Sequence, residues 1–150
     1  MVRITKEFKF EMAHALHGYD GLCKNIHGHS YKLCVTVKGE IKNDNGNPKD
    51  GMVLDFDILK SIVKPEIINK YDHSLVLNAN SPHSEIDLSA FEKVFFLPYQ
   101  PTSENLVTDF ALKIKSKLPQ EIELYKVVLS ETATSFAEWN SHILLNYTNL

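Results

Sequence analysis

The sequence is poor in cysteine, in basic charge and in long apolar runs. Its 150 residues include two cysteines, Cys23 and Cys34, and carry a formal net charge of −3. The lysines are scattered and the net charge is negative, so the sequence offers no basic surface for binding nucleic acid. No uncharged apolar run is long enough to span a membrane, and the first residues lack the apolar core of a signal peptide. We therefore expect one domain over residues 1–150, located in the cytoplasm with reduced thiols, although a disulfide between the cysteines is conceivable.

Histidine, in contrast, follows a pattern. The stretch Cys23-Lys-Asn-Ile-His27-Gly-His29 places a thiol and two imidazoles at the mouth of a strand expected over residues 27–40. Side chains alternate along a strand, so His27 and His29 face the same way. Two imidazoles at this spacing can hold one metal ion. The same pattern also occurs as two half-exposed histidines beside a loop cysteine.

A third histidine lies on the first expected strand, residues 2–15. This segment alternates, with Phe8, Phe10, Met12 and His14 on one face. If it pairs with the second strand as an antiparallel neighbour, the three imidazoles can converge. Three protein ligands with an open fourth position are typical of a catalytic zinc site rather than a structural one. Cys23 would then be either the fourth ligand or a nearby base.

The remaining pattern predicts an α+β domain. Two long strands, then helices, then two more strands indicate an antiparallel sheet of about four strands with helices on one face. Open edges of such a sheet favour oligomerisation through the edges. A short strand is expected at 51–57, followed by a helix at about 58–67 that Asp57 caps and Pro65 interrupts. A second helix is expected between Pro101 and Pro119, capped by Thr102 or Ser103. The last two strands are expected at 124–131 and 132–147.

Three polar residues do not fit a core. Asp72 and His73 follow the first expected helix, and Glu131 ends an apolar strand face. A carboxylate beside an imidazole can fix its tautomer if the side chains meet, but adjacent residues often form only a surface turn. Glu131 is either a solvated carboxylate at a strand end or an acceptor for the N–H groups of a ligand.

Taken in order, these motifs resemble the 6-pyruvoyl-tetrahydropterin synthase and 6-carboxytetrahydropterin synthase family. The resemblance implies a T-fold, in which monomers join edge to edge into barrels, commonly as hexamers with active sites between subunits. It also implies that His14, His27 and His29 hold a zinc ion. The matching segments are Phe10-Glu-Met-Ala-His14, Cys23–His29, Gly51-Met-Val-Leu-Asp-Phe56, Asp72-His73, Pro101-Thr-Ser-Glu-Asn105 and Glu131-Thr132.

The resemblance further implies a role for each polar residue. Cys23 would be the general base, working with a relay formed by Asp72 and His73. Glu131 would anchor the pterin ring of the substrate, 7,8-dihydroneopterin triphosphate. The segment that lines the pterin site corresponds to Thr102, Ser103 and Glu104.

The spacing within the cysteine motif indicates a subtype. Three residues separate Cys23 from His27, as in the bacterial type, which releases acetaldehyde and makes 6-carboxy-5,6,7,8-tetrahydropterin for queuosine. The animal type, with a longer spacer, makes 6-pyruvoyl-tetrahydropterin for tetrahydrobiopterin. The sequence has no glycine-rich phosphate loop, so basic side chains such as Lys24 would have to meet the triphosphate. A zinc hydrolase on the same histidines and a non-catalytic zinc- or pterin-binding T-fold protein are the alternatives.

Overall fold

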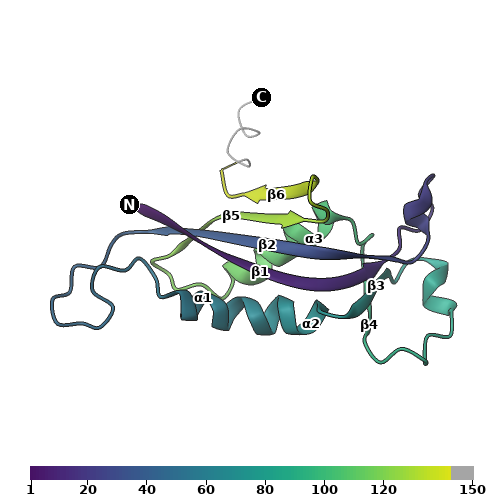
Figure 1. The fold of residues 1–150 in the computed structure, drawn as a ribbon, viewed down its shortest axis with the longest axis horizontal. Helices are drawn as coiled ribbons and strands as arrows, with labels where there is room; N and C mark the ends of the chain where they lie inside the picture. The colour runs from purple at the N-terminus through teal and green to yellow at the C-terminus, as the bar shows by residue number, and fades with distance from the viewer. Residues whose placement is uncertain (143–150) are drawn as a thin grey trace.

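A computed structural model describes residues 1–142, in which six strands form one curled, mixed sheet (Figure 1). The order across the sheet is β4-β3-β1-β2-β5-β6. Neighbours among β1, β2, β5 and β6 are antiparallel, whereas β3 runs parallel to β1 and β4 parallel to β3. The strands are β1 (Val2–His14), β2 (His27–Gly39), β3 (Ser74–Asn78), β4 (Val94–Leu97), β5 (Glu123–Ser130) and β6 (Phe136–Asn140).

The centre of the sheet is the long antiparallel pair of β1 and β2. Each strand has 13 residues, and the register places His14 opposite His27, and Met12 opposite His29. The alternation predicted for the first strand is confirmed, because Phe8, Phe10, Met12 and His14 are all buried. One face of this pair therefore carries both the core and the histidines.

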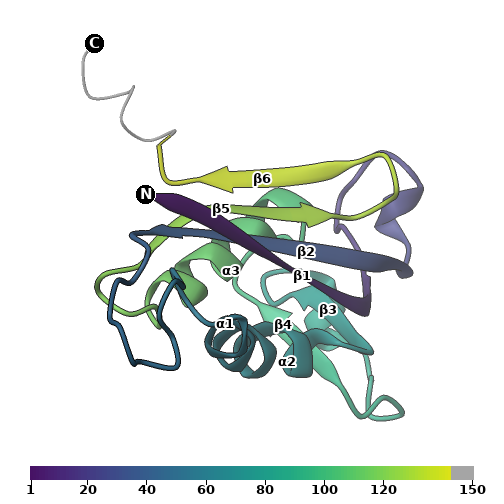
Figure 2. The same ribbon diagram turned by 60° about the vertical axis from the view of Figure 1, so that its left-hand side comes forward.

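The helices cover one face of the sheet (Figure 2). Helix α1 (Phe56–Val63) continues through a π-helical turn at Lys64–Ile68 into α2 (Asn69–Tyr71), and α3 (Ser103–Lys115) packs against β5 and β6. The Thr102 hydroxyl caps α3 by accepting a hydrogen bond from the Asn105 N–H at 3.3 Å. None of the helices within residues 1–142 is long and apolar enough to cross a membrane.

The expected sheet of four antiparallel strands was wrong in two respects. Six strands are present in the described residues, and β3 and β4 extend the β1 edge in parallel. Four of the five β3 residues are buried, so its sequence Ser-Leu-Val-Leu-Asn shows no alternation. A short continuous apolar run of this kind cannot be distinguished from buried helix by periodicity.

Three local expectations also need correction. Residues 51–55 form turns and bends rather than a strand, and the N-cap of α1 is Asp55, which accepts from the Asp57 N–H at 2.9 Å. Pro65 interrupts the α-helical hydrogen bonding as expected, but the chain stays helical as a π turn. The last strand is shorter than predicted, since β6 covers Phe136–Asn140, and residues 143–147 of the prediction lie outside the described residues.

The two leucines of α3 test the assignment of the core. Leu106 is 0% exposed and Leu112 is 57% exposed, so the same substitution should have different costs. We expect Leu106→Ala to lower the free energy of unfolding by about 2–5 kcal/mol, because it leaves a cavity. We expect Leu112→Ala to change it by less than about 1 kcal/mol. Chemical denaturation at one fixed protein concentration measures both, and equal losses would contradict this core.

Candidate metal centre and adjoining cavity

Three histidines from β1 and β2 converge on one point. The strand register aligns His14 with His27, and His29 follows two residues later on the same face. One nitrogen from each ring lies within 4.8 Å of the other two, and the His14 and His27 Nε2 atoms are 3.2 Å apart. The convergence expected from the sequence is confirmed as geometry: this cluster could hold a metal ion.

The backbone orients two of these rings. His14 Nδ1 donates to the Pro101 carbonyl at 2.7 Å, and His27 Nδ1 donates to the Asn25 carbonyl at 2.8 Å. In neutral imidazoles with this tautomer, both Nε2 atoms carry lone pairs. Two lone pairs facing each other at 3.2 Å repel unless a cation lies between them. Tetrahedral zinc, with Zn–N bonds of about 2.0–2.1 Å, separates its nitrogen ligands by about 3.3–3.4 Å, so the observed spacing fits.

Burial lowers the pKa of two of the histidines, His14 and His29. His14 is 1% exposed, and burial lowers its pKa, although the Pro101 carbonyl and the Glu131 carboxylate act in the opposite direction. Burial likewise lowers the pKa of His29, again against the pull of Glu131. Metal ions bind the neutral imidazole, so these shifts extend metal binding to lower pH.

Glu131, which directly follows β5, lies beside the histidine cluster. Its Oε1 atom is 3.5 Å from His14 Nε2 and 3.7 Å from His29 Nε2, and it accepts a hydrogen bond from the Tyr31 hydroxyl at 3.3 Å. Burial raises the pKa of Tyr31, and the Glu131 carboxylate adds to that rise, so the hydroxyl stays protonated and donates. The carboxylate is thus held at the centre while remaining 27% exposed.

A cavity of about 510 Å³ joins Glu131 to the cysteine loop and the start of α3. The expected site residues Cys23, Thr102, Ser103 and Glu104 all line it. The Ser103 hydroxyl oxygen is buried and has no hydrogen-bond partner within the described residues. The other lining residues are Leu16, His17, Gly18, Tyr19 and Gln100.

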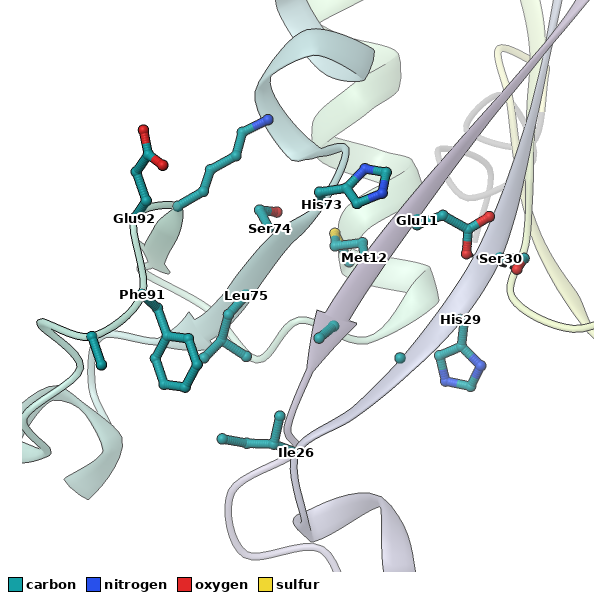
Figure 3. A pocket seen from close by; sticks show the side chains of 14 residues that line it. Glu11, Met12, Ile26, His29, Ser30, His73, Ser74, Leu75, Phe91 and Glu92 are labelled. Carbon is teal, nitrogen blue, oxygen red and sulfur yellow. Dashed lines mark hydrogen bonds between the residues drawn. The ribbon is translucent and has the colours of Figure 1, made fainter.

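Asp72 and His73 lie outside the cavity that contains Cys23. His73 borders a second cavity of about 610 Å³ together with Glu11, Ser30 and His29 (Figure 3). Asp72 does not line this cavity but contacts its edge by accepting from the Glu11 N–H. Within one chain, the predicted relay and the predicted base are therefore not brought together.

The two relay residues nevertheless contact each other. His73 Nδ1 lies 3.1 Å from Asp72 Oδ2, and the other Asp72 oxygen accepts from the Glu11 N–H at 2.9 Å. That N–H lowers the pKa of the Asp72 carboxyl, and His73 contributes in the same direction. The His73 side chain is 78% exposed, so the pair presents an oriented imidazole outward from the chain.

Sequence reasoning missed several residues that position the site. Tyr31 shares a strand face with His29, and its apolar neighbours concealed its contact with Glu131. Gln100 donates from Nε2 to the His17 carbonyl at 2.7 Å, which ties the cysteine loop to the start of α3. The carbonyls that orient the histidines leave no signal in side-chain patterns.

Fold and site together define an α+β protein in which Glu131 lies beside a three-histidine cluster and lines a cavity shared with Cys23. The family described as 6-pyruvoyl tetrahydropterin synthase matches residues 3–142. The chain belongs to this family.

Named relatives agree with this assignment. The chain is 37% identical to the 6-carboxy-5,6,7,8-tetrahydropterin synthase of Haemophilus influenzae, covering 93% of this chain and 99% of that protein. It is 30% identical to the enzyme of the same name from Rickettsia felis, covering 92% and 99%. Among solved structures, the 6-pyruvoyl tetrahydropterin synthase of Caenorhabditis elegans is 26% identical with a TM-score of 0.66, covering 93% and 94%. Protein WS1659 of Wolinella succinogenes shares the fold, with a TM-score of 0.75 at 20% identity over 93% and 98%.

The metal centre can be tested by ligand removal. Because three nitrogens converge within residues 1–142, we expect His14→Ala and His29→Ala each to lose most of the bound metal. His73→Ala, which removes an exposed imidazole elsewhere, should retain it. Elemental analysis of the purified variants after dialysis measures the metal content per chain. Full metal content in His14→Ala and His29→Ala would contradict the assignment.

Proposed function

We propose that this protein is a zinc-dependent 6-carboxy-5,6,7,8-tetrahydropterin synthase. The reaction converts 7,8-dihydroneopterin triphosphate and water to 6-carboxytetrahydropterin, acetaldehyde and triphosphate. The observation that carries the proposal is the placement of Cys23 and Glu131 in one cavity, with Glu131 against the three-histidine cluster. The curated relatives that carry this name match nearly the whole chain.

His14, His27 and His29 would hold the zinc ion through their inward-facing nitrogens. Zinc bound there would supply Lewis-acid chemistry, lowering the pKa of the hydroxyls on the substrate's side chain. The carbonyls of Pro101 and Asn25 accept from the Nδ1 atoms of His14 and His27 and so fix the tautomers that this binding needs.

Glu131 is the proposed anchor of the pterin ring. Its carboxylate accepts hydrogen bonds from the ring N–H and the amino group, a paired contact that fixes the orientation of the ring. Tyr31 donates to one carboxylate oxygen and so limits its rotation. Thr102, Ser103 and Glu104 line the same cavity, where the unpartnered Ser103 hydroxyl offers a further polar contact to the ring.

Cys23 is the proposed general base. It lies in the same cavity as Glu131, so a ring held by the carboxylate extends its side chain toward the thiol loop. His73, oriented by Asp72, would exchange protons at another position of the side chain. Asp72 accepts from His73 Nδ1, which leaves Nε2 as the basic nitrogen.

A second copy of the chain is proposed to complete the site. Cys23 and His73 border different cavities in one chain, yet the reaction needs both near one substrate. The sheet ends in β4 and β6, whose outer edges are unpaired within residues 1–142 and are suited to joining copies. We infer a barrel-shaped homohexamer of T-fold domains with active sites between subunits.

The 6-pyruvoyl product is the second candidate. It is favoured by the structural likeness to the Caenorhabditis elegans enzyme, whereas the names of the more similar relatives favour the carboxy product. The short spacer between Cys23 and His27 also favours the carboxy product. We therefore place the protein in queuosine biosynthesis, in the cytoplasm.

A product assay separates these possibilities. Zinc-loaded protein given 7,8-dihydroneopterin triphosphate should yield 6-carboxytetrahydropterin and acetaldehyde in equal amounts, both identified by mass spectrometry. Cys34→Ala serves as a control that removes the other thiol and should stay active. A 6-pyruvoyl product without acetaldehyde would move the protein to the second candidate. No turnover by a zinc-replete oligomer would favour a binding protein.

Mixing inactive variants tests the shared site. Cys23→Ala and His73→Ala should each lose most activity while keeping zinc, because neither residue belongs to the three-histidine cluster. If each site takes Cys23 from one copy and His73 from another, equal co-refolding of the two variants should restore about a quarter of wild-type activity. In those sites, the copy that supplies Cys23 and the copy that supplies His73 both carry the intact residue. No recovery from the mixture would show that one copy must supply both residues.

A further inference from the structure

We propose that Lys93 is a positioning residue for the Asp72–His73 pair, a role that rests on the function proposed above for that pair. Lys93 immediately precedes β4, and its ammonium group reaches across to the turn between α2 and β3. There Nζ donates to the Asn69 carbonyl at 2.8 Å and to the Asp72 carbonyl at 2.6 Å. One side chain thus bridges the end of the helix and the first residue of the pair.

The turn needs such a contact because its backbone is unfavourable by itself. His73 has a φ of 59°, in the left-handed region that side chains with a β-carbon disfavour. The carbonyls at the end of α2 also have no partner within the helix. An ammonium group at this point satisfies two of them and complements the negative end of the helix dipole.

Other contacts show that the pair is clamped from both sides. On one side, β1 holds it through Glu11, whose N–H donates to Asp72 and whose carbonyl accepts from the His73 N–H at 2.6 Å. On the other side, residue 93 holds it through the ammonium group and through its own carbonyl, which accepts from the Leu75 N–H at 2.9 Å. Figure 3 shows His73 at the edge of the cavity between Ser74 and Glu11. Lys93 is therefore the only side chain among the described contacts that donates to the Asp72 carbonyl.

The charge of Lys93 also acts on the pair. Its ammonium group is among the groups that lower the pKa of the Asp72 carboxyl, after the Glu11 N–H and His73. Two of its three N–H donors are directed to backbone carbonyls. The contact pattern indicates a lysine that holds the backbone of the catalytic turn.

Steady-state kinetics of Lys93 variants tests the proposal. Lys93→Met keeps the aliphatic chain but removes the donors, so His73 loses its fixed position. We expect kcat to fall about 10- to 100-fold, as small misplacements of catalytic groups do. KM should change less than about twofold, because the pterin cavity is untouched. Lys93→Arg, which retains donors and charge, should recover kcat to within about threefold of wild type.

Lys70→Met provides the matched control. Lys70 lies in the same turn region, over the rings of Tyr71 and Phe95, and removing it deletes the same charge without touching the two carbonyls. It should keep wild-type kcat and KM. A raised KM with unchanged kcat in Lys93→Met, or an arginine variant no better than the methionine variant, would overturn the proposal. So would equal losses in Lys93→Met and Lys70→Met.

Imidazole nitrogen NMR of His73 gives a readout that does not require turnover. In the wild type, the contact with Asp72 should give one dominant tautomer, and Lys93→Met should convert it to a mixture that Lys93→Arg reverses. Unchanged His73 signals in Lys93→Met would contradict the positioning role even if activity falls. Altered signals in a protein whose wild type turns over no pterin would retain that role and reject the proposed function. If Lys93→Met fails to fold, Lys93→Gln replaces it. Glutamine is a neutral donor, so its kcat should lie between those of the wild type and an Asp72–His73 pair without the contact.

Discussion

The register between β1 and β2 is the constraint on which the rest of the site depends. It sets His14 opposite His27 and leaves His29 on the same face two residues further along. A slip of one residue would turn every side chain of one strand to the other face and separate the three nitrogens. The same slip would expose Phe8 and Phe10, so the apolar core and the three-histidine cluster both depend on this register.

From this centre, a chain of backbone and side-chain contacts reaches the cavity. The Pro101 carbonyl that orients His14 directly precedes the capped start of α3, so the metal centre and the lining residue Ser103 are fixed relative to each other. The Tyr31 hydroxyl holds the Glu131 carboxylate, which lies beside the Nε2 atoms of His14 and His29. Burial is the largest cause of the pKa shifts at this centre, since it lowers the pKa of His14 and His29 and raises that of Tyr31.

Much of this arrangement could be predicted from the sequence because it depends on periodicity. The alternation of the first strand and the i, i+2 histidines of the second indicated the shared face, and the helix start at Thr102 carried a clear capping signal. The buried parallel strand β3 lacked such a signal, because a strand buried on both faces has no alternation. β4 is only four residues long, too short to show a period. The contacts of Lys93 are long-range and go to backbone carbonyls, so no pattern along the chain encodes them.

The most direct test of the central claim is a crystal structure of the zinc-loaded protein with anomalous data collected at the zinc edge. The geometry predicts one zinc peak per chain, at about 2.0–2.1 Å from a nitrogen of each of His14, His27 and His29. The proposed function further predicts that the Cys23 sulfur lies outside the coordination shell and near His73 of a second copy. A zinc–sulfur bond of about 2.3 Å to Cys23 would contradict the account, because it would make the site a closed structural centre.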